Sequence, residues 1–379
     1  MRRYVIPLVV IVLAACSDRE LSGPDPSLDR SVAASGISVV SWNVYYGADL
    51  DVLLDEAIPL PVRTAMVLGQ VMQTDAPARA AAIARRIAAE RPHLVGLQEV
   101  AEYWRQSPGD LVLGGTEPAS DEIFDFLDLL IAALASEGVS YVVASRTFTL
   151  EAELPMVDAN LGCAPCDDLR FRESVAILAR SDVATSNPQQ QLFQYNLPVE
   201  VAGTTLEILK GWASVDAQLK GTTYRFVTTH LEPADVLPGH EIHPLVHQIQ
   251  LAQAAQLIGA AVSAEIPVIL TGDLNTEPGG TSTAAYGMFM DAGFADTWLK
   301  GRPRGDGFTA NQQADLTNAE SQLWHRIDYV LYRDAFTARG VPFRGAVHAQ
   351  VIGDRQADRT PGGLWPSDHA GVAAVLRMP

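Results

Sequence analysis

Six short polar segments, spread along the chain, carry side chains that could do chemistry. Each of them follows an apolar run of the kind that forms a β-strand. In chain order they are Trp42-Asn43, Gln98-Glu99, Thr229-His230, Asp273-Leu274-Asn275, Arg326-Ile327-Asp328 and Ser367-Asp368-His369. One polar residue after such a run is ordinary, because every strand has to enter a loop. Six in succession, offering Asn, Glu, Asp and His, predict a catalytic face built from strand ends.

The carboxylate and amide groups at the first two positions would suit a hard metal ion. Glu99 follows Leu-Val-Gly-Leu at residues 94–97, a run that should be buried. A carboxylate leaving a buried strand either pairs with a basic side chain or binds a cation through oxygen. Asn43 could give an amide oxygen to that cation or an NH2 group to a phosphate oxygen, although Asn at a strand exit is usually a turn residue.

The later positions offer groups that could manage water and protons. Asp273 could orient or deprotonate a water and Asn275 could hold a phosphoryl oxygen, although an Asx-type turn explains the same spacing equally well. His230 and His369 suit proton transfer near neutral pH, although a lone histidine is more often structural. Asp328 is a candidate partner that fixes the tautomer of His369. One acidic metal site with one or two imidazoles is sufficient to hydrolyse a phosphodiester.

The elements that must position these groups alternate between strands and helices. Apolar stripes predict helices over residues 76–90, 121–135, 243–263 and 281–291. Short apolar runs predict strands over residues 37–41, 93–98, 141–144, 174–178, 206–215, 224–229, 267–270, 326–332 and 370–376. Because some strands alternate with helices and others follow one another, we expect a mixed sheet or two packed sheets with helices outside.

Two segments look like insertions near the expected catalytic face. Residues 49–74 contain Pro59 and Pro61, which should break any helix there, so this segment is expected to form an irregular cap or lid. Residues 147–172 are expected to form a second, loop-rich insertion that contains Cys163 and Cys166. In an exported protein that Cys pair favours a local disulfide, with a redox pair, a metal site or free thiols as alternatives.

The beginning of the chain reads as an export signal. Two arginines precede an apolar stretch, and Leu-Ala-Ala-Cys at residues 13–16 resembles the bacterial lipobox, in which Cys16 is lipidated and becomes the mature N-terminus. The apolar stretch is shorter than the roughly 20 residues of a spanning helix, so an uncleaved anchor is the weaker alternative. Residues 17–36, rich in Ser, Asp, Pro and Gly, predict a disordered tether. We therefore expect a protein that is exported and lipid-anchored on the periplasmic or cell-surface face of a bacterial membrane.

The composition of the whole chain limits the partners of the protein, whose remaining domain is residues 37–379. A hydrophobic content of 48% with 19% charged residues is enough for a sizeable core. The net charge of -18 argues against a broad basic groove for non-specific nucleic-acid binding. It leaves nucleic acid open as a substrate, because a bound divalent cation can supply positive charge where phosphate sits.

Taken together, the six segments resemble the endonuclease/exonuclease/phosphatase superfamily, which has the DNase I-like fold. The resemblance covers residue 37 to the C-terminus, and the six motifs occur in the family order. It implies an α/β four-layer sandwich, in which two mixed β-sheets pack together and helices flank them. It also implies hydrolysis of phosphoester bonds with Mg2+, or with Mn2+ or Ca2+ in its place.

The same resemblance implies roles for individual residues around the metal. Glu99 would be the main Mg2+ ligand, with Asn43 and Asp368 close by. His369, paired with Asp328, would act as a general base or as an imidazole that contacts the phosphate.

Four further residues receive roles from the resemblance. Asp273 would orient or activate the attacking water, and Asn275 would bind the scissile phosphate. His230 corresponds to a second catalytic histidine of the family's nucleases and sphingomyelinases. Glu173 lies where such a protein places the carboxylate partner of that histidine.

The bond that is cleaved can be inferred from these residues, but the molecule that carries it cannot. A nucleic acid and a phospholipid head group both fit as phosphodiester substrates, and the two insertions are the segments expected to choose between them. Besides the membrane reached through the lipid anchor, no protein partner is implied. The alternative from another class is a non-catalytic surface lipoprotein that uses the same fold as a binding scaffold. The complete set of catalytic groups favours the enzyme.

Overall fold

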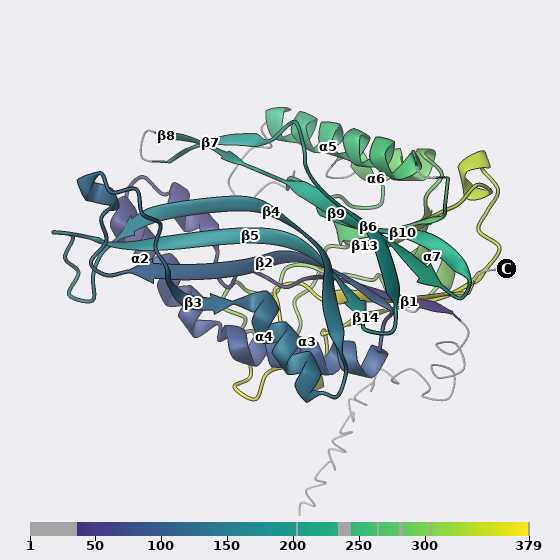
Figure 1. Ribbon diagram of the computed structural model, residues 1–379, viewed down its shortest axis with the longest axis horizontal. Coiled ribbons are helices and arrows are strands. Elements are labelled where there is room, and N and C mark those ends of the chain that lie inside the picture. The colour runs from purple at the N-terminus through teal and green to yellow at the C-terminus, as the bar shows by residue number, and fades with distance from the viewer. Residues whose placement is uncertain are drawn as a thin grey trace, which may run out of the picture.

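Two β-sheets pack face to face, and helices cover their outer sides (Figure 1). The computed structural model describes residues 36–201, 204–233, 244–263, 265–279, 283–303 and 305–377. This arrangement confirms the expected four-layer sandwich. The proposed signal peptide, including Cys16, and nearly all of the proposed tether lie outside the described residues.

The first sheet has seven strands in the order β14-β15-β1-β2-β5-β4, with β3 paired to β2. Its strands are β1 (Ile37–Asn43), β2 (Leu94–Gln106), β3 (Asp121–Asp125), β4 (Tyr141–Met156), β5 (Asp167–Arg180), β14 (Ala346–Ile352) and β15 (Gly371–Arg377). β1 runs parallel to β2 and antiparallel to β15, so that Ile37 lies opposite Leu376 at one end of the sheet. At the other end of β1, Asn43 lies opposite Gln98 of β2.

The second sheet has six strands in the order β12-β13-β11-β10-β9-β6. They are β6 (Ala184–Leu192), β9 (Gly211–Leu219), β10 (Thr222–His230), β11 (Val268–Asp273), β12 (Ala295–Asp296) and β13 (Asp328–Arg333). A separate hairpin is formed by β7 (Leu197–Val201) and β8 (Thr204–Ile208). In the ladder of the second sheet, His230 lies opposite Asp273, and Asp273 lies opposite Asp328. Backbone pairing alone therefore brings His230, Asp273 and Asp328 together at one end of the strands of this sheet. We call this end of the sandwich the catalytic edge.

Helices lie outside both sheets. They are α2 (Leu60–Gln73), α3 (Ala76–Glu90), α4 (Phe126–Ser136), α5 (Pro244–Val262), α6 (Ala285–Asp291) and α7 (Thr297–Gly301), together with the short 3-10 turns η1 (Leu50–Leu54), η2 (Leu111–Leu113), η3 (Thr337–Arg339) and η4 (Gln356–Asp358). Figure 1 shows α3 and α4 on the side of the first sheet and α5 and α6 on the side of the second. No helix within the described ranges is long and apolar enough to cross a membrane.

The two sheets are joined by a buried apolar layer, and one glycine allows them to approach closely. Val175 and Ile177 of β5 pack in the same cluster as Val215, Phe226 and Ile269 of the second sheet. A Cβ atom on Gly96 would collide with the Thr228 and Thr271 side chains of the second sheet. A side chain at this position would therefore push the sheets apart next to the catalytic edge.

The expected cap at residues 49–74 is wrong in its secondary structure, because the segment contains a 14-residue helix, α2. Pro59 is the N-cap and Pro61 lies in the first turn. A proline at these positions removes an N–H group that has no partner inside the helix, so it starts the helix instead of breaking it.

The expectation of a loop-rich insertion at residues 147–172 is also wrong. β4 continues to Met156 and β5 begins at Asp167, which makes one long hairpin. Only residues 157–166 connect them, and Cys163 and Cys166 are joined as a disulfide in this connection.

Candidate active site

Glu99 is presented to the catalytic edge by a bulge in β2. Its φ of 55° lies in the left-handed region, and the β2–β5 register shifts between Leu97 and Val100. A left-handed glutamate is uncommon and is held here by its surroundings. The carboxylate accepts hydrogen bonds from Asn43 Nδ2 at 2.8 Å and from the Tyr46 N–H at 3.2 Å.

The surroundings of Glu99 disfavour its charge. Burial and the negative charge of Asp368 raise the pKa of Glu99 to about 8. A carboxylate with this pKa requires either a proton or a nearby cation at neutral pH. The donor set around it, which is rich in carboxylate oxygen, fits a hard divalent cation.

Asn43 connects the two sheets by binding both carboxylates at the edge. Its Nδ2 donates to Glu99 and, at 3.1 Å, to Asp273 Oδ2. Its Oδ1 accepts from the Tyr45 N–H at 3.0 Å. In this conformation the amide orients the carboxylates and its oxygen is already engaged, so the role of Asn43 as a metal ligand stays a prediction.

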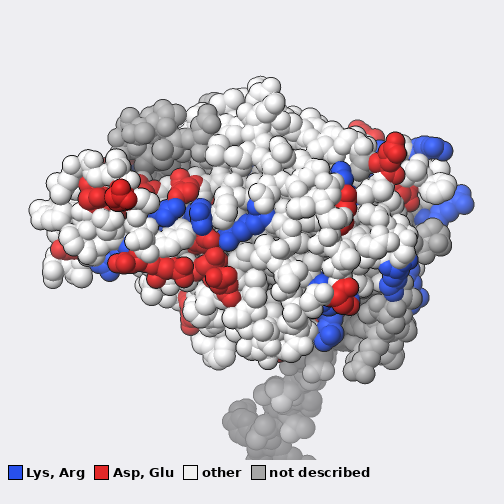
Figure 2. Space-filling model, in the orientation of Figure 1, with Lys and Arg blue, Asp and Glu red and all other residues white. Residues whose placement is uncertain are grey.

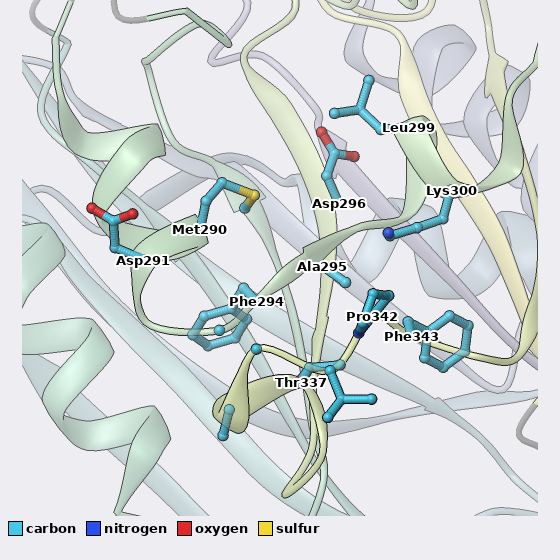
Figure 3. Close-up of a pocket in the computed structure, with 14 residues that line it drawn as sticks. Met290, Asp291, Phe294, Ala295, Asp296, Leu299, Lys300, Thr337, Pro342 and Phe343 are labelled. Carbon is cyan, nitrogen blue, oxygen red and sulfur yellow. The ribbon is translucent and has the colours of Figure 1, made fainter.

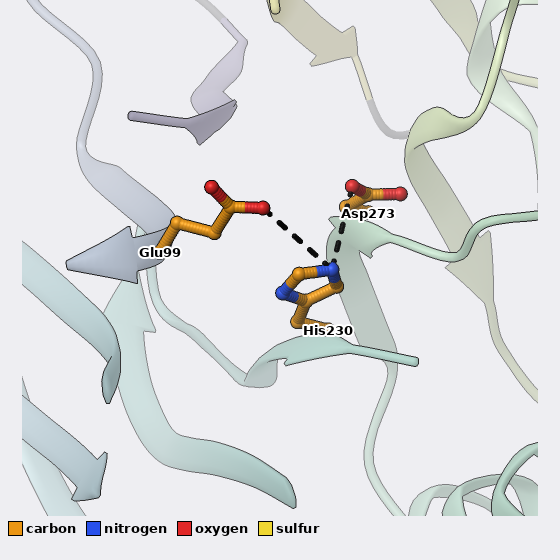
Figure 4. A group of neighbouring side chains, drawn as sticks. All are labelled: Glu99, His230 and Asp273. Carbon is orange, nitrogen blue, oxygen red and sulfur yellow. Dashed lines mark ion pairs between the residues drawn. The ribbon is translucent and has the colours of Figure 1, made fainter. Parts of the chain in front are cut away.

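His230 lies between acidic groups of both sheets (Figure 4). Its Nε2 is 4.0 Å from Glu99 Oε1 and 3.6 Å from Asp273 Oδ2, and its Nδ1 is 3.5 Å from Glu173 Oε1. The three ligand atoms of Glu99, His230 and Asp273 all lie within 4.8 Å of one another. The structure therefore brings Glu99, His230, Asp273 and His369 together, since His369 Nε2 also lies 3.9 Å from Asp273 Oδ2.

His369 makes the expected pair with Asp328. Its Nδ1 is 2.9 Å from Asp328 Oδ2, and its Nε2 is 3.9 Å from Asp273 Oδ2. Burial lowers the pKa of His369, but the Asp328 and Asp368 carboxylates outweigh it and hold that pKa well above its ordinary value. Burial also raises the pKa of Asp328 to about 6. The raised pKa favours the charged form of this buried imidazole, whose Nε2 faces Asp273.

The side chains of Asp368 and Asn275 form hydrogen bonds within the protein that do not by themselves show the roles expected of them. Asp368 is partly exposed, and its Oδ1 accepts from the Ser367 hydroxyl at 3.2 Å. Asn275 has a φ of 48°, its N–H binds Asp273 Oδ1, and its Nδ2 binds the Leu231 carbonyl at 2.9 Å. These bonds show the Asx-type turn at Asn275, while its phosphate-binding role and the ligand role of Asp368 stay predictions.

A buried lysine at this edge was not found from the sequence. Lys210 is 3% exposed, and its Nζ lies 3.3 Å from His230 Nδ1 and 3.8 Å from Glu173 Oε1. Burial lowers the pKa of Lys210, but Glu173 and other nearby carboxylates raise it above its ordinary value. Burial would raise the pKa of Glu173, and Lys210 with His230 reverses that effect and lowers it.

Glu232 is a second group that the sequence reading missed. It is 2% exposed, and burial raises its pKa to about 7 despite the charge of Lys210. Its position two residues after His230 was a usable signal, since it prolongs the polar end of the same strand. The only signal for Lys210 was a lone basic residue before Gly211, at the start of β9.

The cavity shown in Figure 3 lies elsewhere and carries no comparable set of groups. It has a volume of about 370 Å³ and lies among α6, β12, α7 and η3. The buried acid on its lining, Asp296, is already bonded to Arg326, Tyr286 and the Trp298 N–H. None of the candidate catalytic residues lines this cavity.

The layered sandwich and the acid–imidazole cluster at its edge define a class of protein, the metal-dependent hydrolases of phosphoesters. The model of the endonuclease/exonuclease/phosphatase family matches residues 40–369, and the chain belongs to this family. With its acidic and imidazole groups assembled, the chain is a metal-dependent phosphodiester hydrolase of the family's type. No curated protein sequence matches the chain.

Two solved structures show the same fold at low sequence identity. An endonuclease/exonuclease/phosphatase family protein from Bacteroides thetaiotaomicron is 16% identical, with a TM-score of 0.51, over 91% of this chain and 96% of the other. A humanized TDP2 from D. rerio that carries 14 mutations is 17% identical, with a TM-score of 0.50, over 90% of this chain and 99% of the other.

Proposed function

We propose that the chain is an exported, lipid-anchored phosphodiesterase that hydrolyses its substrate with Mg2+. The observation that carries the catalytic part is the convergence of Glu99, His230, Asp273 and His369 from both sheets on one edge. Phosphodiester hydrolysis needs a cation next to the phosphate and groups that move protons. The cluster supplies carboxylates that could bind the cation, together with imidazole and carboxylate groups that could move protons.

Glu99 would hold the cation, with Asn43 and Asp368 close by. When bound there, Mg2+ would neutralise charge that develops on the phosphoryl oxygens. The buried, high-pKa carboxylate of Glu99 supports this assignment, because an isolated charge at such a position is otherwise costly.

The chain's own residues would handle the water and the protons. Asp273, which faces both imidazoles, would take a proton from the attacking water as its oxygen bonds to phosphorus. The ester P–O bond would break, and the leaving oxygen would take a proton from the His369 imidazole. The proton on Asp273, whose Oδ2 lies 3.9 Å from His369 Nε2, would then restore the imidazole. The raised pKa of His369 supports a protonated imidazole that contacts the phosphate, rather than the general base that the resemblance also allowed.

Purified protein should hydrolyse bis(p-nitrophenyl) phosphate with Mg2+, and EDTA should abolish the reaction. Glu99→Gln keeps the size of the side chain and removes its charge, so it should lose both activity and Mg2+ binding measured by calorimetry. Full activity of that variant would contradict the assignment. A panel of DNA, RNA, sphingomyelin and inositol phosphates would then identify the substrate class.

Export and anchoring are supported by the lipobox-like residues 13–16. Cys16→Ser should abolish labelling by radioactive palmitate and move the protein out of the membrane fraction. Unchanged labelling of that variant would refute the anchor and leave the catalytic proposal untouched.

A further inference from the structure

A second pocket, which we call the β5 pocket, lies next to the candidate active site. It is enclosed by η1 and α2 on one side, the β7–β8 hairpin on another, and the outer parts of β4 and β5 as its floor. Its volume is about 150 Å³. Leu53, Val67, Leu150, Leu154, Phe171 and Ile208 are among the residues that line it.

The floor of the β5 pocket continues directly from the catalytic carboxylate on the same strand. Side chains two residues apart on a strand share a face, and they lie roughly 7 Å apart along it. Leu169 and Phe171 line the pocket, and Glu173 follows next on that face of β5. The Tyr46 ring packs edge-on against Phe171 with 5.6 Å between centroids, and the Tyr46 N–H binds Glu99. The pocket therefore lies beside the candidate catalytic residue Glu173 and, through Tyr46, beside Glu99.

The polarity of the residues that line the β5 pocket indicates which kind of ligand group it could bind. The hydroxyls of Tyr103 and Thr64 are bonded to the Tyr46 and Leu60 carbonyls, so neither is directed to a ligand. The remaining polar residue, Asp51, is exposed, and none of the described lining residues is basic. A nucleobase is read by hydrogen bonds and its backbone by basic groups. A saturated hydrocarbon needs neither.

We propose that the β5 pocket is a subsite for the hydrocarbon chain of an amphiphilic phosphodiester, of the kind found in phospholipids. This inference rests on the proposed function and narrows its substrate class. The exposed Leu54 at the rim, with 49% of its surface accessible, extends the apolar lining toward solvent, from which a chain would enter.

The test uses methyl, butyl and hexyl 4-nitrophenyl phosphate, which share one leaving group and differ only in the chain. Burial of each added methylene should raise kcat/KM by roughly two- to fourfold until the pocket is full. The wild-type protein should therefore prefer the hexyl ester over the methyl ester by at least about tenfold. Equal values across the series would overturn the proposal.

Ala152→Phe would fill the pocket from its floor, because Ala152 lies opposite Phe171 in the β4–β5 ladder. It should reduce the hexyl-to-methyl ratio of kcat/KM toward one. Ala184→Phe, on the exposed part of β6, is the matched control and should keep the ratio of the wild type. Leu154→Gln makes the lining polar at similar size and should also lower the ratio, so the test survives a folding defect in one variant.

Two further measurements separate failure of this inference from failure of the proposed function. Absence of bis(p-nitrophenyl) phosphate hydrolysis would refute the proposed function alone. Calorimetry with methyl and hexyl phosphonate would then test the subsite separately. The wild type should bind the hexyl compound more tightly than the methyl compound, and Ala152→Phe should abolish this difference. A series without chain-length dependence, together with slower hydrolysis of a single-stranded oligonucleotide by Ala152→Phe, would assign the pocket to a base.

Discussion

At the residue scale, removal of the His369 imidazole, which pairs with Asp328, should have the largest effect on the chemical step. We expect His369→Ala to lower kcat by roughly 100- to 10,000-fold, which is the usual contribution of a positioned acid or base. The variant should still fold, because His369 lies at the end of the strands rather than between the sheets, but it should lose some stability because the buried Asp328 loses its partner. Steady-state kinetics with bis(p-nitrophenyl) phosphate and circular dichroism would check both parts. A variant that keeps wild-type kcat would exclude a direct role.

Lys210 makes a different prediction, which concerns stability as well as rate. Lys210→Met leaves the fully buried Glu173 without its cation, 3.8 Å away in the wild type. Loss of one partner of a buried pair typically costs about 3 kcal/mol of unfolding free energy. Urea denaturation should show this loss, and kcat should fall because His230 loses its neighbour. Lys300→Met, on the exposed end of α7, serves as the control and should change neither quantity.

The residues that could be identified from the sequence are those that end a strand within a recognisable motif, such as Glu99 and Asp273. Lys210 could not be identified in this way, because its contact with His230 depends on the pairing of β9 with β10. That pairing places Gly211, the residue after it, opposite His230. A lone lysine in a sequence gives no information on such a partner across the ladder.

At the scale of elements, the start of α3 offers a prediction about stability. Asp75 caps this helix by accepting from the Ala78 N–H at 3.1 Å, and its φ of 45° is left-handed. Asp75→Ala loses the cap and keeps the strained backbone, so it should destabilise the protein by about 1–2 kcal/mol. Asp75→Gly loses the cap but accepts this φ, and it should cost less. Urea titrations that rank the two variants in the opposite order would contradict this account.

Helices and strands with a clear period could be predicted from the sequence, and α3 and β11 are examples. The elements that were mispredicted depend on position or on pairing. Pro61 starts a helix only because it lies in the first turn. The outer parts of β4 and β5 pair with each other, and the outer part of β5 also pairs with β2. Polar and apolar residues alternate there, so no continuous apolar run marks these strands in the sequence. Residues 121–125, which were expected to begin a helix, form β3 by pairing with β2, and β14 forms by pairing with β15.

At the scale of the whole molecule, the face drawn in Figure 2 carries no continuous basic surface of the kind that binds a long polyanion. Figure 2 shows basic and acidic side chains mixed on one face rather than a continuous basic band. Arginines of β4 and β5 are paired with acids, as Arg146 is with Glu102 and Asp125, and Arg172 is with Glu102. Paired guanidinium groups contribute little to phosphate binding.

The buried Glu99 also links the stability of the whole protein to pH and metal. Its pKa of about 8 exceeds the ordinary 4.5 because of burial and Asp368. Between these values the metal-free folded protein binds more protons than the unfolded chain, so this stabilising contribution is full at low pH and is lost as pH rises through about 8. A cation binds the ionised form and should compensate for the loss.

With EDTA, the Tm should therefore fall between about pH 6 and about pH 8.5, and millimolar Mg2+ should raise it more at the higher pH. Thermal unfolding followed by circular dichroism would measure both effects. Glu99→Gln does not titrate, so its Tm should respond less to pH and to Mg2+. An equal increment from Mg2+ at both pH values in the wild type would refute the linkage.

The pairing of Ile37 with Leu376 has a practical consequence for work with this enzyme. Both residues lie at the end of β1 opposite Asn43, roughly 20 Å from the catalytic edge at the usual rise of a strand. A biotin tag or a sensor chip joined to the carboxyl end would thus attach the molecule on the side opposite the catalytic edge. The working surface would face outward and could reach bulky assemblies such as vesicles.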